Sequence, residues 1–169
     1  MSKRSIIIFT LLTLVLLSFQ TDNEKKRNVV VVSKSLMTLC VYDDNVYENA
    51  NAKLLATYPI ACGKNLGNKT KKGDMKTPEG RFRIIQIQNA SSWTHDFHDG
   101  KGEVKNAYGK YFLRLEVKGF SGIGIHGTHD PSSIGKRVTE GCIRLKNEDL
   151  NELVKLVALG SVVYITPEQ

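Results

Sequence analysis

Short runs of β-branched and aromatic residues, separated by clusters of Gly, Asn and Asp, fill most of the chain from residue 28 onward. β-Branched and aromatic residues favour strands, whereas Gly, Asn and Asp favour the turns between strands. Two polar stretches, 64–79 and 89–108, lack the pattern and are predicted to be irregular. We expect strands at 29–32, 36–42, 53–60, 81–87, 111–117 and 122–126. This division is typical of a mostly-β domain.

One stretch near the C-terminal end has helical periodicity instead. Asn147 is predicted to cap the start of this helix and Gly160 to end it, with a last strand at 162–166. Its apolar residues recur at intervals of three and four, as one face of a helix requires: Leu150, Leu153, Val154 and Val157. The chain has no internal repeat and no second core. We therefore expect a single domain with one helix.

The N-terminal residues 1–20 are predicted to be a signal peptide or an N-terminal membrane anchor. Lys3 and Arg4 form a positive start, and an apolar run follows at 5–19. As a helix this run would be roughly 22 Å long, shorter than the ~30 Å hydrocarbon core of a bilayer. A secretory signal therefore fits better than a membrane span, although the residues that follow make a poor cleavage site. In both cases the working domain, 27–167, is expected outside the cytoplasm.

The net charge of the domain limits the kinds of molecule that it is expected to bind. Without Lys3 and Arg4, 22 basic residues remain against 17 acidic ones, a net charge of +5. Such a surface either serves solubility or attracts an anionic partner, for example a carboxylate-rich polymer. Nucleic acid is disfavoured, because the domain is predicted to be exported and its basic clusters are not interleaved with aromatic residues.

The three cysteines leave at least one thiol unpaired. Cys40 and Cys62 lie on the two arms of a predicted hairpin in which Cys40 would face about Ala56. Cys62 would then lie roughly 20 Å farther along the ladder, beyond the ~7 Å limit on Cα separation for a disulfide. We expect both to be small core residues, which leaves Cys142 as the candidate reactive thiol.

Two short segments carry the candidate chemistry: Gly122-Ile123-Gly124-Ile125-His126-Gly127 and Gly141-Cys142-Ile143-Arg144-Leu145. Strand alternation places His126, Cys142 and Arg144 on open faces, and the glycines beside the histidine would leave room for a substrate. A lone Cys or His is more often structural. Together, however, a thiol, an imidazole that accepts its proton and a nearby cation suit acyl transfer through a thiolate. Backbone N–H groups around residues 141 and 142 are candidate donors to an oxyanion.

These segments, together with Thr77-Pro78-Glu79-Gly80-Arg81-Phe82, resemble the catalytic domain of the L,D-transpeptidases, which are bacterial cell-wall enzymes. The similarity runs from about residue 27 to residue 165. It implies a β-sandwich-like domain of mixed strands, with one helix after a cysteine that lies at a cleft. It implies peptidoglycan stem peptides as substrates, in the periplasm or cell envelope, and neither a metal nor an organic cofactor. We expect the domain to be a monomer.

The resemblance also implies a role for each site residue. Cys142 would attack the carbonyl after the third residue of a stem tetrapeptide, releasing D-alanine and forming a thioester that an amine acceptor resolves. His126 would be the general base and acid, oriented by the backbone carbonyl of Gly127. The residues predicted to bind substrate are Arg144, Gly141 and Thr139.

One position departs from the family pattern. The family often has a histidine directly before the Gly-Cys pair, where this chain has Glu140. A carboxylate facing Cys142 would raise the pKa of the thiol. We therefore expect Glu140 to point away from it and to accept loop N–H groups or pair with Lys136 or Arg137. In that orientation, Glu140→Gln would stay within about tenfold of wild-type activity, or ~1.4 kcal/mol of barrier.

Other functions stay open at this point. Water as acceptor would make the protein a cell-wall L,D-carboxypeptidase or amidase, and the departure at Glu140 would suit a non-catalytic wall-binding module. Two histidine pairs are spaced by three residues, but neither has the HExxH pattern of a zinc site: His95/His98 and His126/His129. Three aromatic residues near the site are expected to be core rather than cleft residues: Tyr108, Tyr111 and Phe112.

Overall fold

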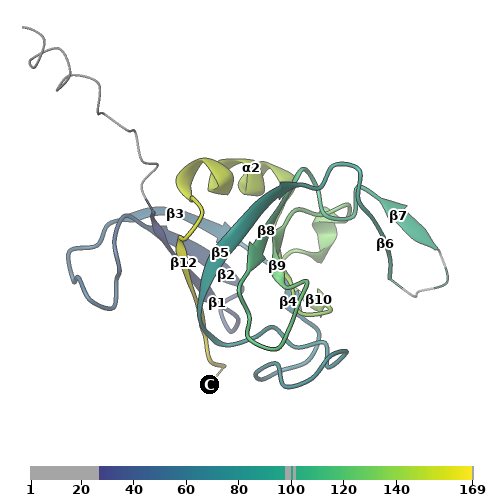
Figure 1. The fold of residues 1–169 in the computed structure, drawn as a ribbon, viewed down its shortest axis with the longest axis horizontal. Coiled ribbons are helices and arrows are strands. Elements are labelled where there is room, and N and C mark those ends of the chain that lie inside the picture. Colours follow the sequence, from purple (N-terminus) through teal and green to yellow (C-terminus); the bar gives the residue numbers. More distant parts are fainter. Residues whose placement is uncertain (1–26, 98–99, 101, 169) are drawn as a thin grey trace, which may run out of the picture.

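The computed structural model describes residues 27–97, 100 and 102–168. Its main element is one curled sheet of eight strands (Figure 1). Across the sheet, their order is β11 (Ile143–Arg144), β9 (Gly124–His126), β8 (Tyr111–Leu115), β5 (Gly80–Asn89), β12 (Val162–Thr166), β1 (Val29–Ser33), β2 (Thr38–Tyr42) and β3 (Leu54–Pro59). The β1–β12 and β9–β11 pairs are parallel, and the other neighbours are antiparallel. The predicted fold class, mostly β with a mixed sheet, is confirmed.

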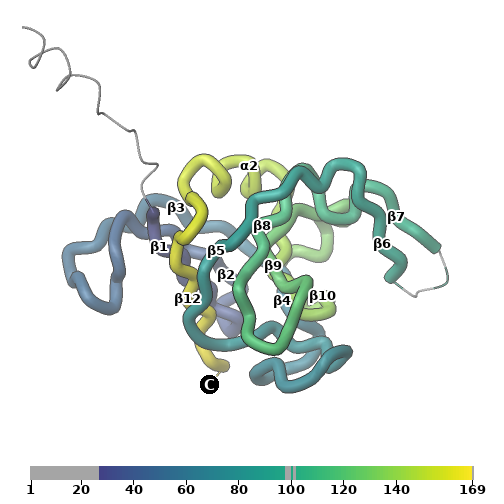
Figure 2. The backbone as a smooth tube through the Cα atoms, in the orientation of Figure 1, coloured from purple at the N-terminus to yellow at the C-terminus, as the bar shows by residue number. Residues whose placement is uncertain are grey.

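Shorter elements complete the described fold. β4 (Cys62–Gly63) pairs with β10 (Arg137–Thr139), and a short 3₁₀ turn, η1 (Pro131–Ser133), precedes β10. β6 (Thr94–Asp96) and β7 (Glu103–Lys105) form a hairpin that projects from the rest of the domain (Figure 2). The prediction that 89–108 is irregular is therefore wrong at this hairpin. Its strands contain no fully buried residue, so the sequence has no apolar alternation there to reveal them.

The core lies between the sheet and the helix α2 (Asn147–Leu156). Every second residue of the central strands is buried: Val30, Val32, Leu39, Val41, Val163 and Ile165. Each fully buried residue of this size contributes roughly 1.5–3 kcal/mol. Ile125 of β9 and Ile143 of β11 are also fully buried. The core therefore anchors the two short strands that carry the candidate chemistry.

The start of α2 differs from the prediction. Lys146, not Asn147, is the N-cap, and it makes no capping hydrogen bond with its side chain. The Asn147 amide instead accepts from the Thr128 N–H and donates to the Thr128 carbonyl, both at 3.0 Å. Residue 127 must be glycine for this contact, because a Cβ there would lie 2.1 Å from Asn147 Oδ1. Asn147 thus fastens the helix to the chain directly after β9.

The cysteines of the hairpin are only partly as expected. All three cysteines are free thiols, and Cys62 is fully buried. A bulge between Val41 and Tyr42 places Cys40 opposite Thr57 rather than Ala56. Cys40 is half-buried, because the alternation of β2 turns its neighbours inward, so its prediction as a core residue is wrong.

No helix in the described part of the chain is long and apolar enough to cross a membrane. The predicted signal peptide or anchor, 1–20, lies outside the described residues.

Candidate active site

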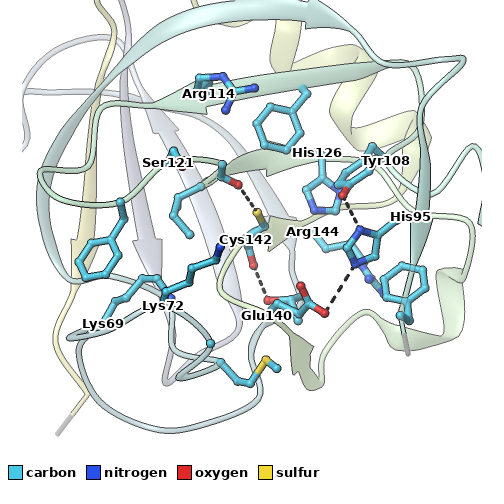
Figure 3. A pocket seen from close by; sticks show the side chains of 18 of the residues that line it. Lys69, Lys72, His95, Tyr108, Arg114, Ser121, His126, Glu140, Cys142 and Arg144 are labelled. Atoms are coloured by element: carbon cyan, nitrogen blue, oxygen red, sulfur yellow. Dashed lines mark hydrogen bonds and ion pairs between the residues drawn. The ribbon is translucent and has the colours of Figure 1, made fainter. Parts of the chain in front are cut away.

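A cleft of about 530 Å³ opens at the β9–β11 edge of the sheet (Figure 3). Its walls come from β8, β9 and β11, from the lysine-rich loop after β4, from the turn at 119–123, and from the β6–β7 hairpin. Cys142, His126 and Arg144, which the sequence placed on open faces, all line it. Segments that are far apart in the chain therefore meet in one cavity.

The parallel pairing of β9 and β11 fixes how the three residues lie. Ile143 pairs with Ile125, and Arg144 lies directly opposite His126. Leu145 then donates its N–H to the His126 carbonyl at 2.8 Å. With Ile125, Ile143 and Leu145 all fully buried, the predicted inward faces are confirmed.

His126 is buried, and its ring is held on several sides. Nδ1 lies 2.7 Å from the Gly127 carbonyl oxygen, as the family resemblance implied. Because a carbonyl oxygen only accepts, Nδ1 carries the proton and Nε2 is left as an acceptor. Burial lowers the pKa of His126 to about 3; the bond to Gly127 opposes this shift, and the Arg144 charge adds to it. The imidazole is therefore a neutral base at physiological pH.

Cys142 is also neutral at rest. Its Sγ lies 3.3 Å from the Gly122 carbonyl oxygen, to which the thiol donates. Burial raises the pKa of the thiol to about 11; a Gly124 N–H and the Arg144 and Lys69 charges oppose this shift, and Glu140 adds to it. The residue keeps part of its surface open to the cleft. A neutral thiol beside a neutral imidazole suits proton transfer during attack rather than a preformed thiolate.

Arg144 is a buried guanidinium with an unused donor. Its Nη1 donates to Ser133 Oγ at 3.2 Å, and the ring of Phe97 lies 5.6 Å from its central carbon. Its Nε has no hydrogen-bond partner among the described residues. Leaving a charged N–H unpaired in the interior is costly. A ligand that brings an anionic or carbonyl oxygen to the guanidinium would relieve this cost, because the oxygen accepts the hydrogen bond.

Thr139 and Gly141 shape the turn that presents Cys142. The Thr139 hydroxyl donates to the Cys142 carbonyl at 2.6 Å and accepts from the Gly141 N–H at 3.2 Å. Gly141 has φ of +137°, and a Cβ there would lie 2.8 Å from the Lys76 carbonyl oxygen. The Gly141 N–H is thus already engaged, which weakens its expected part as an oxyanion donor. The substrate-binding roles of both residues stay predictions.

The two glycines before His126 differ. At Gly122 an added Cβ would meet nothing within 4 Å, as the prediction of open space requires. At Gly124 it would lie 2.4 Å from Cε1 of Phe112. That space is filled by an aromatic ring rather than left for substrate, so the prediction is wrong there. Phe112 and Tyr108 were expected in the core, yet both line the cleft and contact the His126 ring.

Glu140 does not pair with Lys136 or Arg137. Its Oε1 lies 3.6 Å from Nε2 of His95, on the β6–β7 hairpin, and its side chain lines the cleft (Figure 3). Arg137 instead forms an ion pair with Glu168. The predicted pairing is therefore wrong, and the tenfold limit on Glu140→Gln loses its basis because the carboxylate lies in the cleft. No local pattern around residue 140 predicts this contact, because it depends on how the hairpin docks.

The histidine pairs offer no metal site in the described part of the chain, where no group of three or more His, Cys, Asp or Glu residues could hold an ion. His98 lies outside the described residues. His95 is engaged by Tyr108, whose hydroxyl lies 3.0 Å from its Nδ1.

Comparison with known proteins places these features in a family. Residues 27–165 match the family model of the L,D-transpeptidase catalytic domain. The YkuD protein of Bacillus licheniformis is 36% identical over 138 residues, or 82% of this chain, and that of Bacillus subtilis is 37% identical over 115 residues, or 68%. The chain spans 65% and 56% of the lengths of these two relatives.

Solved structures agree on the fold. The helical cell shape determining protein Pgp2 from Campylobacter jejuni matches with a TM-score of 0.60 at 22% identity, over 86% of this chain and 50% of its own. An L,D-transpeptidase from Mycobacterium smegmatis matches with a TM-score of 0.55 at 17% identity, over 83% of this chain and 58% of its own. At these identities the likeness extends to the fold alone.

Proposed function

The chain belongs to the L,D-transpeptidase catalytic-domain family, and on that premise we propose that it transfers peptidoglycan stem peptides through a thioester on Cys142. One observation carries the proposal: the Cys142 thiol and the neutral His126 imidazole line one cleft, on strand ends that pair in parallel. The family consists of bacterial cell-wall enzymes, which agrees with a basic domain and an anionic polymer as substrate.

Acylation begins when His126 Nε2 takes the thiol proton. The Cys142 sulfur attacks the carbonyl carbon after the third residue of a stem tetrapeptide, and the carbonyl oxygen becomes an oxyanion. His126 then returns the proton to the nitrogen of the departing D-alanine. The C–N bond breaks and the C–S bond remains as a thioester. Because the proton on Nδ1 stays in place, Nε2 can first accept the thiol proton and later donate it to the leaving nitrogen.

Arg144 is the proposed substrate clamp. Its guanidinium lines the cleft and supplies donors for a carboxylate or carbonyl of the donor stem. Because a guanidinium presents its donors in a planar fork, it fixes the orientation of the group that it binds as well as its position. Thr139 and Gly141 support the nucleophile from the turn before it.

We propose that the domain works outside the cytoplasm, in the periplasm or cell envelope, with residues 1–20 as a signal peptide or membrane anchor. This rests on the positive start and the apolar run of the sequence. We propose that it acts as a monomer.

The direct test is incubation with a purified disaccharide-tetrapeptide, followed by mass analysis of the products and of the intact enzyme. We expect release of D-alanine, a thioester adduct on Cys142 and a cross-linked product. Release of D-alanine without any cross-linked product, at high acceptor concentration, would identify the L,D-carboxypeptidase alternative. Binding to peptidoglycan with no adduct would identify a wall-binding module.

A further inference from the structure

The cleft contains a single carboxylate among its described lining residues, that of Glu140. It also contains four basic side chains, of which Lys69 pairs with Asp74: Lys69, Lys72, Arg114 and Arg144. This distribution attracts the carboxylates of a stem peptide and repels an ammonium group from most of the cavity. The side where Glu140 lies is the exception.

Glu140 is unfavourable for the first half of the proposed reaction. Burial raises the pKa of the Cys142 thiol, and the Glu140 carboxylate raises it further. A negative charge here therefore opposes formation of the thiolate. In the thioester the sulfur carries no charge, so this penalty is absent until the C–S bond breaks again. A favourable role for the Glu140 carboxylate is therefore one that involves the acceptor, which enters only in the second half of the reaction.

His95 faces the Glu140 carboxylate at the edge of the cleft. Burial raises the pKa of Tyr108, so its hydroxyl stays protonated and can donate to His95 Nδ1 at 3.0 Å. The remaining ring proton of His95 is then on Nε2, which faces Glu140 Oε1 at 3.6 Å. This distance is too long for a direct hydrogen bond. With 48% of its side chain exposed, the Glu140 carboxylate remains accessible to a ligand.

We propose that Glu140, positioned by His95, binds the ammonium group of the acceptor beside the thioester on Cys142. The inference rests on the proposed function and specifies its acceptor as a cationic primary amine, such as that of a diamino acid in a second stem. As the C–N bond forms, the C–S bond breaks. The ammonium first gives one proton to Glu140, which releases it to water, and the freed nitrogen lone pair then attacks. His126 takes a second proton and returns it to the sulfur, and the third stays on the amide nitrogen.

The test measures how the acyl-enzyme divides between transfer and hydrolysis. Wild type, Glu140→Gln and His95→Gln are supplied with one tetrapeptide donor and either D-lysine or hydroxylamine as acceptor. D-Lysine is cationic at neutral pH, whereas hydroxylamine is largely uncharged. Because both products arise from the same thioester, their ratio does not depend on how fast the thioester forms. Glu116→Gln is the matched control, since Glu116 is an exposed carboxylate outside the cleft.

We expect Glu140→Gln to lower the transfer-to-hydrolysis ratio with D-lysine by at least about tenfold, the effect of losing one close charge pair. His95→Gln should lower it by a smaller factor. Hydroxylamine should give the same ratio in every variant, and Glu116→Gln should match wild type. An unchanged ratio with D-lysine, or an equal fall with hydroxylamine, would overturn this inference alone. Absence of any Cys142 adduct in wild type would overturn the proposed function, and the inference with it.

Discussion

The ring of Phe112 lies parallel to the ring of His126, with 5.7 Å between centroids and 9° between planes. Phe112 can occupy this place only because residue 124 is glycine, as a Cβ there would collide with the phenyl ring. Tyr108 covers the imidazole edge-on, with 4.9 Å between centroids. Together with the Gly127 carbonyl, these contacts fix the plane and the tautomer of His126 before a substrate binds.

Replacing Phe112 by leucine should disturb the imidazole without removing it. We expect acylation to slow by roughly tenfold, because a misplaced base loses its orientation. The acid limb of the pH profile should move to higher pH, because burial is the main cause of the lowered pKa of His126. Acylation by a reactive β-lactam, followed by intact mass at several pH values, measures both. Phe82→Leu, a half-buried phenylalanine of β5 outside the cleft, is the control. An unchanged pH profile would contradict this role of Phe112.

In wild type, acylation should change little between about pH 5 and 8. A base must be unprotonated to act, and a pKa lowered to about 3 keeps His126 neutral throughout this range. The rate should fall only in stronger acid. His126→Ala should reduce it by ~10²–10⁴-fold, whereas His129→Ala, at an exposed histidine, should not. An acid limb centred near 6.5, the value of a free imidazole, would show that His126 is not buried in solution.

Cys142 should be the thiol whose loss abolishes turnover of the tetrapeptide. Cys142→Ala is expected to fold normally, with no D-alanine release and no adduct. Cys40→Ala should be nearly neutral, because Cys40 is half-buried and outside the cleft. Cys62→Ala should keep activity but lose about 1 kcal/mol of unfolding free energy in urea, because this side chain is fully buried. Turnover in Cys142→Ala would refute the thioester mechanism.

Arg144→Lys should lower kcat/KM by about tenfold or more despite keeping the charge. An ammonium supplies no planar fork and cannot replace the Nε donor while it also reaches Ser133. Steady-state kinetics with the tetrapeptide tests this, with Arg83→Lys on the exposed face of β5 as the control. A lysine variant that matches wild type would make Arg144 a generic cation.

Asp74 should stabilise the lysine-rich loop that forms one wall of the cleft. Burial would raise the pKa of this carboxyl, but hydrogen bonds from Lys69 and from the N–H groups of Lys71, Thr70 and Lys76 outweigh it and hold the pKa well below its usual range. The stability that it contributes is therefore present above pH ~4, the unfolded value, and is lost as pH falls below it. Asp74→Asn should cost roughly 1–3 kcal/mol at pH 7, measured by urea unfolding. Equal stability of the two proteins at pH 7 would contradict this account.

The sequence by itself determined the fold class and the strand faces on which His126, Cys142 and Arg144 lie. Strand alternation at 122–126 and at Ile143 predicts which residues turn into the core, and His126, Cys142 and Arg144 lie on the opposite side, where they line the cleft. These predictions succeed because they depend on local periodicity, which the backbone enforces wherever the strand ends up. The helix was recognised for the same reason, from the spacing of Leu150 and Leu153.

Only the tertiary structure decided which side chains meet across the cleft. Glu140 had two basic residues close by in the sequence, yet it lies against His95 of a distant hairpin. Phe112 fills the space beside Gly124, and Asn147 binds Thr128 instead of capping its own helix. The choice among such partners depends on how separate segments dock. The free energy of docking is shared among many buried contacts, so the periodicity of one segment does not reveal it.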